Sequence, residues 1–444
     1  MTSLIKEITM KYICDFHIHS KYSRAVSQEM DVENLDKWAR LKGIKVLGTG
    51  DFTHPGWLSE LKEKLEPAES GLYKIKNQIS DIKNNGTRFI LTTEISNIYS
   101  KGGRGRRIHN VIFAPSFEVV DKINTQLSWV GNLKSDGRPI LGLDSRELLK
   151  IVLNISPDCF FVPAHAWTPW FGLFGSQSGF DSLEECFDDY SKYIYSIETG
   201  LSSDPAMNWR WSALDRLTLI SNSDAHSPRN LGREANVFEG NELNYKAIVE
   251  AIKLGSGRRD SRMSPALKLI YTIEFFPQEG KYHFDGHRAC EVSFSPEETK
   301  AHKNICPKCG RPLTIGVMNR VDELADRPEG AKPPGAIPFK SLVPLEEIIA
   351  DALGVGKQSK SVQEEYQRLV SILGSEFEIL LERNRNELEK IASPLVVDGI
   401  IRVREGKVKI KPGFDGEFGK IEIFSQEEKE KIKKGDSLGQ NSLF

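Results

Sequence analysis

Two histidines separated by one residue, His17 and His19, constrain this chain more than any other feature of its sequence. They follow a short apolar run, residues 12–16, that is typical of a β-strand. Because alternate residues of a strand project from the same face, both imidazole rings can reach one metal ion or one pair of ions. Two unrelated histidines at a polar strand end have the same pattern, so the rest of the chain must decide between these interpretations.

Length and composition are those of an ordinary globular protein. The chain has 444 residues, of which 39% are hydrophobic and 27% charged, and this length corresponds to roughly two or three domains. The net charge of −2 excludes a globally basic nucleic-acid-binding protein, so any DNA contact must be local. No N-terminal leader and no apolar run near the ~18 residues of a membrane span is present. We therefore expect a cytoplasmic protein with reduced cysteines and no membrane partner.

Further candidate ligands recur at the ends of predicted strands. These strands alternate with helical segments, an order that fits a barrel whose site gathers at one rim. Glu94 stands inside an apolar strand, where a carboxylate needs a cation or a partner arginine. For His109 and His165 the alternative is a hydrogen-bonded core histidine. The candidates on or just after the strands are His17, His19, Glu94, His109, His165, Asp224 and His226.

The mixture of imidazole and carboxylate ligands limits the chemistry. It suits zinc, manganese or iron better than calcium, which prefers oxygen ligands. A cluster of two or three such ions ionises a bound water near neutral pH and holds a phosphate for in-line displacement. Phosphoester hydrolysis is therefore the reaction that the residues favour.

Motifs around these residues resemble the PHP (polymerase and histidinol phosphatase) superfamily of metal-dependent phosphoesterases. They read His-Ile-His-Ser, Gly-Asp-Phe-Thr-His, Thr-Glu-Ile-Ser, His-Asn-Val-Ile-Phe-Ala-Pro, Pro-Ala-His-Ala-Trp and Ser-Asp-Ala-His. The resemblance implies an α/β fold, a distorted, TIM-like βα barrel with two or three zinc, manganese or magnesium ions. It implies that metal is held by the seven candidates above, with Asp224, His226 and Glu94 as the catalytic residues.

Two departures from the superfamily pattern concern the ligand set. The second motif usually reads Asp-His, whereas here Asp51 and His54 are three positions apart. We expect Asp51 to be the ligand, with His54 as its substitute. A further ligand often stands seven or eight residues after the first histidine, where this chain has Arg24 and Ala25.

Nearly the whole chain resembles the endonuclease Q family. The most distinctive motifs are Lys-Tyr-Ser-Arg-Ala, Pro-Ala-His-Ala-Trp-Thr-Pro-Trp-Phe-Gly and Cys-Pro-Lys-Cys-Gly-Arg-Pro-Leu-Thr-Ile-Gly-Val. The resemblance implies an endonuclease that nicks damaged DNA, double- or single-stranded, 5′ of hypoxanthine, uracil, xanthine or an abasic site. A PHP phosphatase or 3′ exonuclease is the alternative within the superfamily. A DNA-binding accessory protein with a degenerate metal site is the alternative outside enzymes.

Aromatic and basic residues near the candidate ligands indicate where DNA is bound. An enzyme that inspects a base must take it out of the stack and offer it a pocket or an aromatic wedge. The alternatives are a hydrophobic plug for the aromatic residues and a solvated hairpin tip for the basic loop. The candidates for DNA contact are Arg24, Arg104, Arg106, Arg107, Trp167, Trp170 and Phe171.

A Cys-x-x-Cys pair in the second half predicts a structural zinc site. Cys306 and Cys309 follow Cys290 at the spacing of a zinc ribbon. His287 fits the fourth ligand position best, with His283 and His302 as rivals. Four protein ligands leave no position for a catalytic water.

The remaining sequence divides the chain into four regions. We expect a barrel at 1–270, a zinc ribbon at 271–325, a mostly helical region at 326–425 and a flexible tail at 426–444. The spacing of apolar residues predicts helices at 345–353, 362–373 and 376–391. Residues 400–411 alternate like a strand of a hairpin. The tail ends in a segment that resembles the peptides by which bacterial repair proteins bind the DNA sliding clamp, although a frayed terminus is the alternative. Its clamp-binding residues would be Gln440, Leu443 and Phe444.

Overall fold

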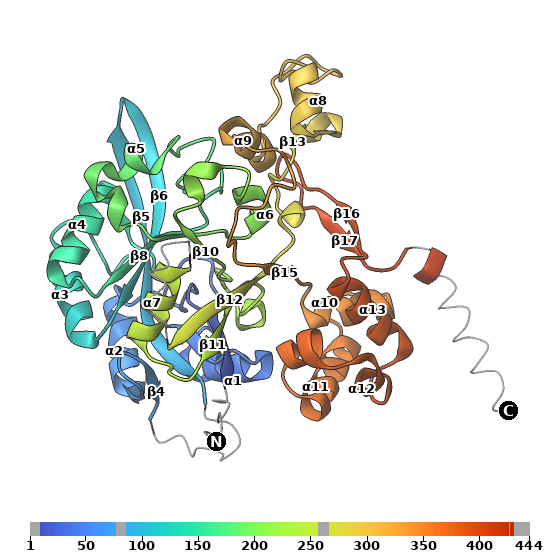
Figure 1. Cartoon of the computed structure of the whole chain (residues 1–444), viewed down its shortest axis with the longest axis horizontal. Coiled ribbons are helices and arrows are strands. Elements are labelled where there is room, and N and C mark those ends of the chain that lie inside the picture. Colours follow the sequence, from blue (N-terminus) through green and yellow to red (C-terminus); the bar gives the residue numbers. More distant parts are fainter. Residues whose placement is uncertain (1–8, 77–85, 256–265, 426, 430–444) are drawn as a thin grey trace, which may run out of the picture.

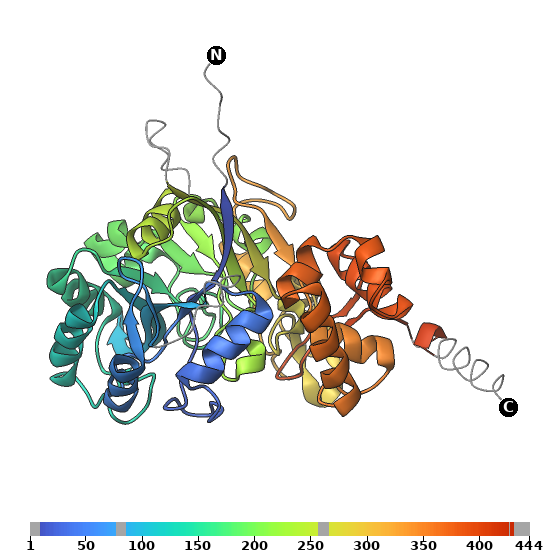
Figure 2. The same cartoon turned by 90° about the horizontal axis from the view of Figure 1, so that it is seen from below.

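The computed structural model describes residues 9–76, 86–255, 266–425 and 427–429, and three groups of elements are visible in it (Figure 1). A large α/β body contains the first twelve strands, a small module carries α8 and α9, and a group of helices follows it. Figure 2 shows α10 to α13 gathered at one side of the α/β body, next to α1 (Val32–Lys42). The ammonium of Lys42, at the end of α1, lies 2.7 Å from the carboxylate of Glu376, so the two parts are joined by a buried ion pair.

The wall of the body is a distorted barrel. Strands β1, β2 and β5 pair in parallel, whereas β1 with β11, β5 with β6 and β6 with β8 are antiparallel. After β8 the wall continues through the backbone bond from Ala166 N–H to Glu198 O (3.0 Å) into the parallel pair of β9 and β10. The side chain of Asn236 then joins Ser221, after β10, to β11. The strands are β1 (Met10–Asp15), β2 (Val46–Gly48), β5 (Arg88–Lys101), β6 (Arg104–Ala114), β8 (Phe160–Pro163), β9 (Ser196–Glu198), β10 (Thr218–Ile220), β11 (Ala235–Gly240) and β12 (Leu267–Glu274).

The predicted α/β fold is confirmed. The prediction that strands and helices alternate throughout is wrong for several pairs of neighbouring strands. Strands β5 and β6 are joined only by Gly102 and Gly103, whose φ angles of 62° and 73° suit a tight two-residue turn. A connection this short forces the two strands to be antiparallel. The basic segment before His109 is therefore the tip of a long hairpin, and contact of this tip with DNA stays a prediction.

Helices cover the outside of the barrel and begin at local capping signals. Asp31 accepts a bond from Asn34 N–H at the start of α1, and Gly43 ends that helix with a φ of 89°. The other helices of the body are α2 (Pro55–Lys64), α3 (Phe117–Ser128), α4 (Ser145–Ile155), α5 (Leu183–Phe187), α6 (Pro205–Asn208) and α7 (Tyr245–Leu254). Buried apolar side chains of helices and strands fill the space between the two layers.

The small module and the helical group correct two predictions. The module holds β13 (Asp285–His287), β14 (Val292–Phe294), α8 (Pro296–Ala301) and α9 (Val317–Leu324), and α10 (Leu345–Leu353) and α11 (Lys360–Leu373) confirm predicted helices. The predicted helix at 376–391 is interrupted by a π-helical turn before α12 (Arg385–Glu389). Of the predicted strand at 400–411, residues 400–404 belong instead to α13 (Pro394–Arg404), because Val396, Ile400 and Val403 recur at helical spacing and are buried. The strand β16 (Lys409–Lys411) pairs with β17 (Lys420–Glu422).

Candidate functional site

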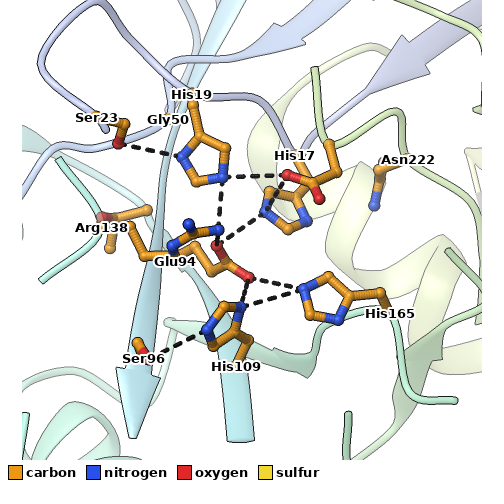
Figure 3. A network of polar contacts seen from close by, with 12 residues as sticks. His17, His19, Ser23, Gly50, Glu94, Ser96, His109, Arg138, His165 and Asn222 are labelled. Atoms are coloured by element: carbon orange, nitrogen blue, oxygen red, sulfur yellow. Dashed lines mark hydrogen bonds and ion pairs between the residues drawn. The ribbon is translucent and has the colours of Figure 1, made fainter. Parts of the chain in front are cut away.

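Six predicted ligand side chains meet inside the barrel, with Glu94 at the centre (Figure 3). One group of ligand atoms comes from His17, His19, Glu94 and Asp224, and a second comes from Glu94, His109 and His165. The ligand atoms of each group lie within 4.8 Å of one another. Glu94 belongs to both groups because its two oxygens face different partners. Its Oε1 lies 2.7 Å from His109 Nδ1 and 3.0 Å from His165 Nε2, and its Oε2 lies 3.3 Å from His19 Nε2.

The donor atoms of the cluster fit divalent metal ions. His17 Nε2, His19 Nε2 and Asp224 Oδ1 are buried and make no well-formed hydrogen bond, although all three belong to one group of ligand atoms and His19 Nε2 lies 3.1 Å from Asp224 Oδ1. Leaving such atoms unsatisfied is costly, and a shared cation removes that cost. Imidazole nitrogens mixed with carboxylate oxygens suit transition metals such as zinc and manganese, and a carboxylate facing two groups suits a bridge between two ions.

Two further carboxylates hold the first pair of histidines from behind. Asp51 lies 3.0 Å from His19 Nδ1 and accepts bonds from the backbone and hydroxyl of Ser20. Glu198 lies 3.0 Å from His17 Nδ1 and accepts the His165 backbone N–H at 2.8 Å. Carboxylates in this position fix the ring and direct Nε2 toward a metal. Asp51 supports a candidate ligand here and lies outside both groups of ligand atoms, so its expected role as a ligand stays a prediction.

Two other predicted ligands also lie outside these groups. The ring of His54 caps α2 by accepting the Trp57 N–H and stacks on Tyr22 with ring centres 4.4 Å apart. His226 Nδ1 donates to the backbone oxygen of Asp224 at 2.8 Å, and its ring lies 4.7 Å from that of His19. These contacts give His54 a structural role, whereas His226 lies beside the cluster on the wall of a cavity.

The charges of the cluster shift the pKa values of its members in opposite directions. Burial raises the pKa of Glu94, but the charges of His109 and Arg138 outweigh burial and hold it well below the usual carboxyl value. Burial lowers the pKa of His17 and of His19, but Glu198 and Asp51 raise these values well above that of free histidine. A metal must therefore displace protons from these two rings, so we expect metal binding to weaken in acid.

A cavity of about 520 Å³ opens onto the cluster. Arg138 lines it and donates to Glu94 Oε2 at 3.1 Å, so a guanidinium already lies beside the ligands. The sequence analysis missed Arg138 and Glu198. Glu198 had a signal, because it ends a predicted strand as the other ligands do, whereas Arg138 follows no strand and had none. Other residues lining the cavity include Arg24, His109, His165, Trp170, Phe171, Asp224 and His226.

The aromatic candidates for DNA contact divide into buried and accessible side chains. Trp167 is 1% exposed and donates to the Asn208 side chain at 2.8 Å, so it belongs to the core and cannot contact DNA in this conformation. Trp170 is 37% exposed. The Phe171 ring lies 4.5 Å from the ring of His109. The plug alternative therefore applies to Trp167, and the other two aromatic residues line the cavity.

The arginine candidates also differ in their surroundings. Arg24 is exposed at the cavity, and Arg104 is exposed at the hairpin tip. Arg106 donates to the Gly179 backbone oxygen and stacks on Phe180 at 4.0 Å, so it supports the fold around the hairpin. Arg107 lies 5.8 Å from the centre of the Phe171 ring.

The four predicted zinc ligands of the small module come together. Ligand atoms of His287, Cys290, Cys306 and Cys309 lie within 4.8 Å of one another, which selects His287 over the two rival histidines. His283 is 4% exposed and packs beside Phe284, and His302 stacks on Phe294 at 4.7 Å. One His–Cys pair and one Cys–Cys pair fit one tetrahedral zinc. The predicted clamp residues Gln440, Leu443 and Phe444 lie outside the described residues.

Among the residues that the structure describes, no helix is long and apolar enough to cross a membrane.

Two family models match separate parts of the chain. Residues 208–256 match the model described as PHP-associated, and residues 344–407 match the model of the MJ0043 C-terminal domain. The uncharacterized protein YqxK of Bacillus subtilis is 29% identical over 426 residues, which cover 93% of this chain and 99% of YqxK. The uncharacterized protein MJ0043 of Methanocaldococcus jannaschii is 36% identical over 269 residues, which cover 59% of this chain and only 32% of MJ0043.

Two solved structures match almost the whole chain. One is the lesion-specific endonuclease PfuEndoQ from Pyrococcus furiosus, with 33% identity, a TM-score of 0.80 and coverage of 93% of this chain and 96% of that one. The other is endonuclease Q in complex with a 27-mer duplex substrate that has an abasic lesion at the active site. It also has 33% identity and a TM-score of 0.80, with coverage of 95% and 98%. Identity of this degree over nearly the full length of both chains shows that the chain belongs to the endonuclease Q family.

Proposed function

We propose that this chain is a metal-dependent DNA endonuclease that nicks the backbone 5′ of deaminated bases and abasic sites. The observation that carries the proposal is the cluster of ligand side chains around Glu94, which opens onto a cavity lined by Arg24 and Arg138. Guanidinium groups beside metal ligands suit a phosphate backbone. The related endonuclease Q was solved with an abasic duplex, which supports damaged DNA as the substrate.

The ligands and their supports divide the work of the site. Bound zinc, manganese or magnesium would activate water and neutralise phosphate charge. Glu94 holds the two ligand groups together, and the carboxylates of Asp51 and Glu198 keep the rings of His19 and His17 oriented. Because this preorganisation is present before substrate arrives, little rearrangement is needed at the moment of reaction.

Residues on the cavity wall can bind the substrate and move a proton. Arg138 reaches Glu94 from the cavity and is placed to share its guanidinium with a phosphate oxygen. The Nδ1–H of His226 donates to Asp224 O, which leaves Nε2 of the neutral ring as a proton acceptor. We therefore assign substrate binding to Arg24 and Arg138, and proton transfer to His226.

The rest of the chain supports this activity in our proposal. One zinc on His287, Cys290, Cys306 and Cys309 holds a module at 271–325 beside the barrel at 1–270. The helical region at 326–425 packs on the barrel, and the tail at 426–444 binds the sliding clamp through Gln440, Leu443 and Phe444. A cytoplasmic location keeps the ribbon thiols reduced and gives access to DNA.

The test is cleavage of end-labelled duplexes that carry hypoxanthine, uracil, an abasic site or no lesion. Wild type and Asp224→Ala are compared with and without a chelator. We expect a metal-dependent nick 5′ of each lesion, lost in the variant. Lesion-independent digestion from a 3′ end would instead indicate an exonuclease, and release of phosphate from small monoesters a phosphatase. Binding without cleavage would indicate an accessory protein.

A further inference from the structure

Three exposed apolar side chains lie together on one loop, residues 129–140. Trp129 is 75% exposed, Ile140 is 61% exposed and Val130 is 39% exposed. Trp129 is the most exposed of the large hydrophobic side chains that the structure describes. Water-exposed apolar side chains gathered in this way mark a binding surface more often than isolated ones do. We call Trp129, Val130 and Ile140 the apolar rim.

Backbone contacts place one end of the apolar rim, Ile140, at the mouth of the active-site cavity, with the turn of Trp129 and Val130 beside it. Ile140 lines the cavity together with candidate metal ligands. It stands opposite Ser96 on β5, and the hydroxyl of Ser96 contacts His109. The turn that carries Trp129 and Val130 lies against the same place, because a Cβ on Gly131 would be 2.6 Å from Leu141 Cδ2.

The loop is fixed to the ligand segments at further points. Gly137 N–H donates to Tyr22 O at 3.0 Å, and Arg138 donates to Glu94. The Arg24 N–H donates to the Asp136 carboxylate at 3.3 Å. A loop tied in this way presents its apolar side chains at a constant place relative to the catalytic cluster.

Exposed cations stand on the loop of the apolar rim and on the segment bonded to it. Lys134 is exposed on the same loop, and Arg24 is exposed on the neighbouring segment and lines the cavity. Apolar side chains flanked by cations suit DNA, in which base faces are apolar and the backbone is anionic. A protein partner would not require the rim to adjoin a phosphodiesterase cavity.

We propose that the apolar rim fills the gap that a damaged nucleotide leaves in the duplex when it enters the cavity. Extruding a nucleotide removes stacking from its neighbours, and an inserted apolar side chain replaces that contact. Trp129 and Ile140 are then positioning residues that favour the extruded state. The inference rests on the proposed nicking function and adds the surface that engages the remaining stack.

The test compares the same abasic strand in a duplex and alone, because a single strand has no stack to fill. The variants are Trp129→Ala, Ile140→Ala and the double variant. Trp129→Phe keeps an aromatic ring, and Ile372→Ala is the control, since Ile372 is 55% exposed on α11. We expect kcat/KM on the duplex to fall about tenfold in each single alanine variant and on the single strand to change less than about twofold. Trp129→Phe should keep most of the duplex activity.

A second measurement does not depend on cleavage. The fluorescence of 2-aminopurine beside the lesion rises when it loses its stacking partner, and we expect rim variants to bind the duplex with a smaller rise. Unchanged activity and fluorescence, or equal losses on duplex and single strand, would overturn the proposal. Wild type that nicks neither substrate would refute the proposed function, and the fluorescence of wild type and Trp129→Ala would still decide the role of the rim.

Discussion

The barrel cluster and the ribbon cluster are both built from metal-binding side chains, but they are held in different ways. Barrel ligands come from positions 17 to 224 and are fixed by strands with large buried cores of their own. Ribbon ligands come from positions 287 to 309, and the buried apolar cluster beside them contains only Val292, Cys306 and Leu313. Small modules with so little core depend on their metal to fold. The comparison supports our proposal that metal serves chemistry in the barrel and structure in the ribbon.

Removing one barrel ligand gives the sharpest test of this contrast. We expect Asp224→Ala to lower the nicking rate by about three orders of magnitude or more, because the first ligand group loses its accessible carboxylate. The temperature of global unfolding should change little, since the cores of the barrel do not include Asp224. Asp121→Ala, which removes an exposed carboxylate of α3, is the control. A barrel that unfolds on loss of Asp224 alone would break the comparison.

Removing one ribbon ligand should have the opposite signature. Cys309→Ser is expected to release one zinc per chain and to remove the hydrogen-exchange protection of the module, because structural zinc supplies about 10 kcal/mol or more of folding free energy. The barrel amides should stay protected, and nicking should fall about tenfold through weaker DNA binding. His302→Ala should keep the zinc, since that ring stacks on Phe294 away from the ligands. Global unfolding of the Cys309 variant would contradict this assignment.

The carboxylates behind the barrel histidines give a smaller effect. We expect Asp51→Asn and Glu198→Gln each to weaken metal binding about 10- to 100-fold, because their rings lose an orienting acceptor. A chelator competition measures this affinity directly. Asp189→Asn, at an exposed position that pairs with Arg146, serves as the control. Unchanged affinity in both variants would show that the rings are held by packing alone.

The stability of the barrel and the stability of the ribbon should depend on pH with opposite signs. Burial raises the pKa of Glu274, a fully buried carboxyl of β12, to about 8. The folded state therefore keeps a proton that the unfolded chain releases above its ordinary carboxyl pKa. This contribution to stability is present at low pH and is lost as pH rises toward 8, by a few kcal/mol at most.

Glu274→Gln should flatten this loss of stability in chemical unfolding followed from pH 5 to 8. The stability of the ribbon should instead rise with pH, because zinc requires deprotonated thiols and is lost in acid. A wild-type stability that rises with pH through this range to the same extent as in the variant would contradict the shifted pKa.

The sequence predicted the ligand set of the barrel because each ligand follows a recognisable strand. The spacing of His17 and His19 and the buried position of Glu94 are local signals, and the structure brings these side chains together. The support from Arg138 could not be predicted in the same way. Arg138 meets Glu94 through a loop 44 positions away in the chain, and no periodic pattern encodes that contact.

Prediction from the sequence was limited in the same way for the pairing of strands and for the elements near the end of the chain. Helices with a clear cap, such as α10 with Gly354 at its end and α11 with Ser359 at its start, match their predicted positions closely. The antiparallel hairpin of β5 and β6 was only the alternative interpretation, because its basic tip reads as a loop. Residues 400–404 were misassigned to a strand because the alternation of charged residues hid the helical spacing of the buried ones, whereas 409–411 do form a strand.

The most direct measurement of the central claim is metal content together with nicking of an abasic duplex by Glu94→Gln. Glu94 is shared by both ligand groups, and glutamine keeps its shape without its charge. We predict loss of the barrel metals and of nicking, with the ribbon zinc and the unfolding temperature retained. Glu94→Gln that nicks the abasic duplex at the wild-type rate would contradict the account.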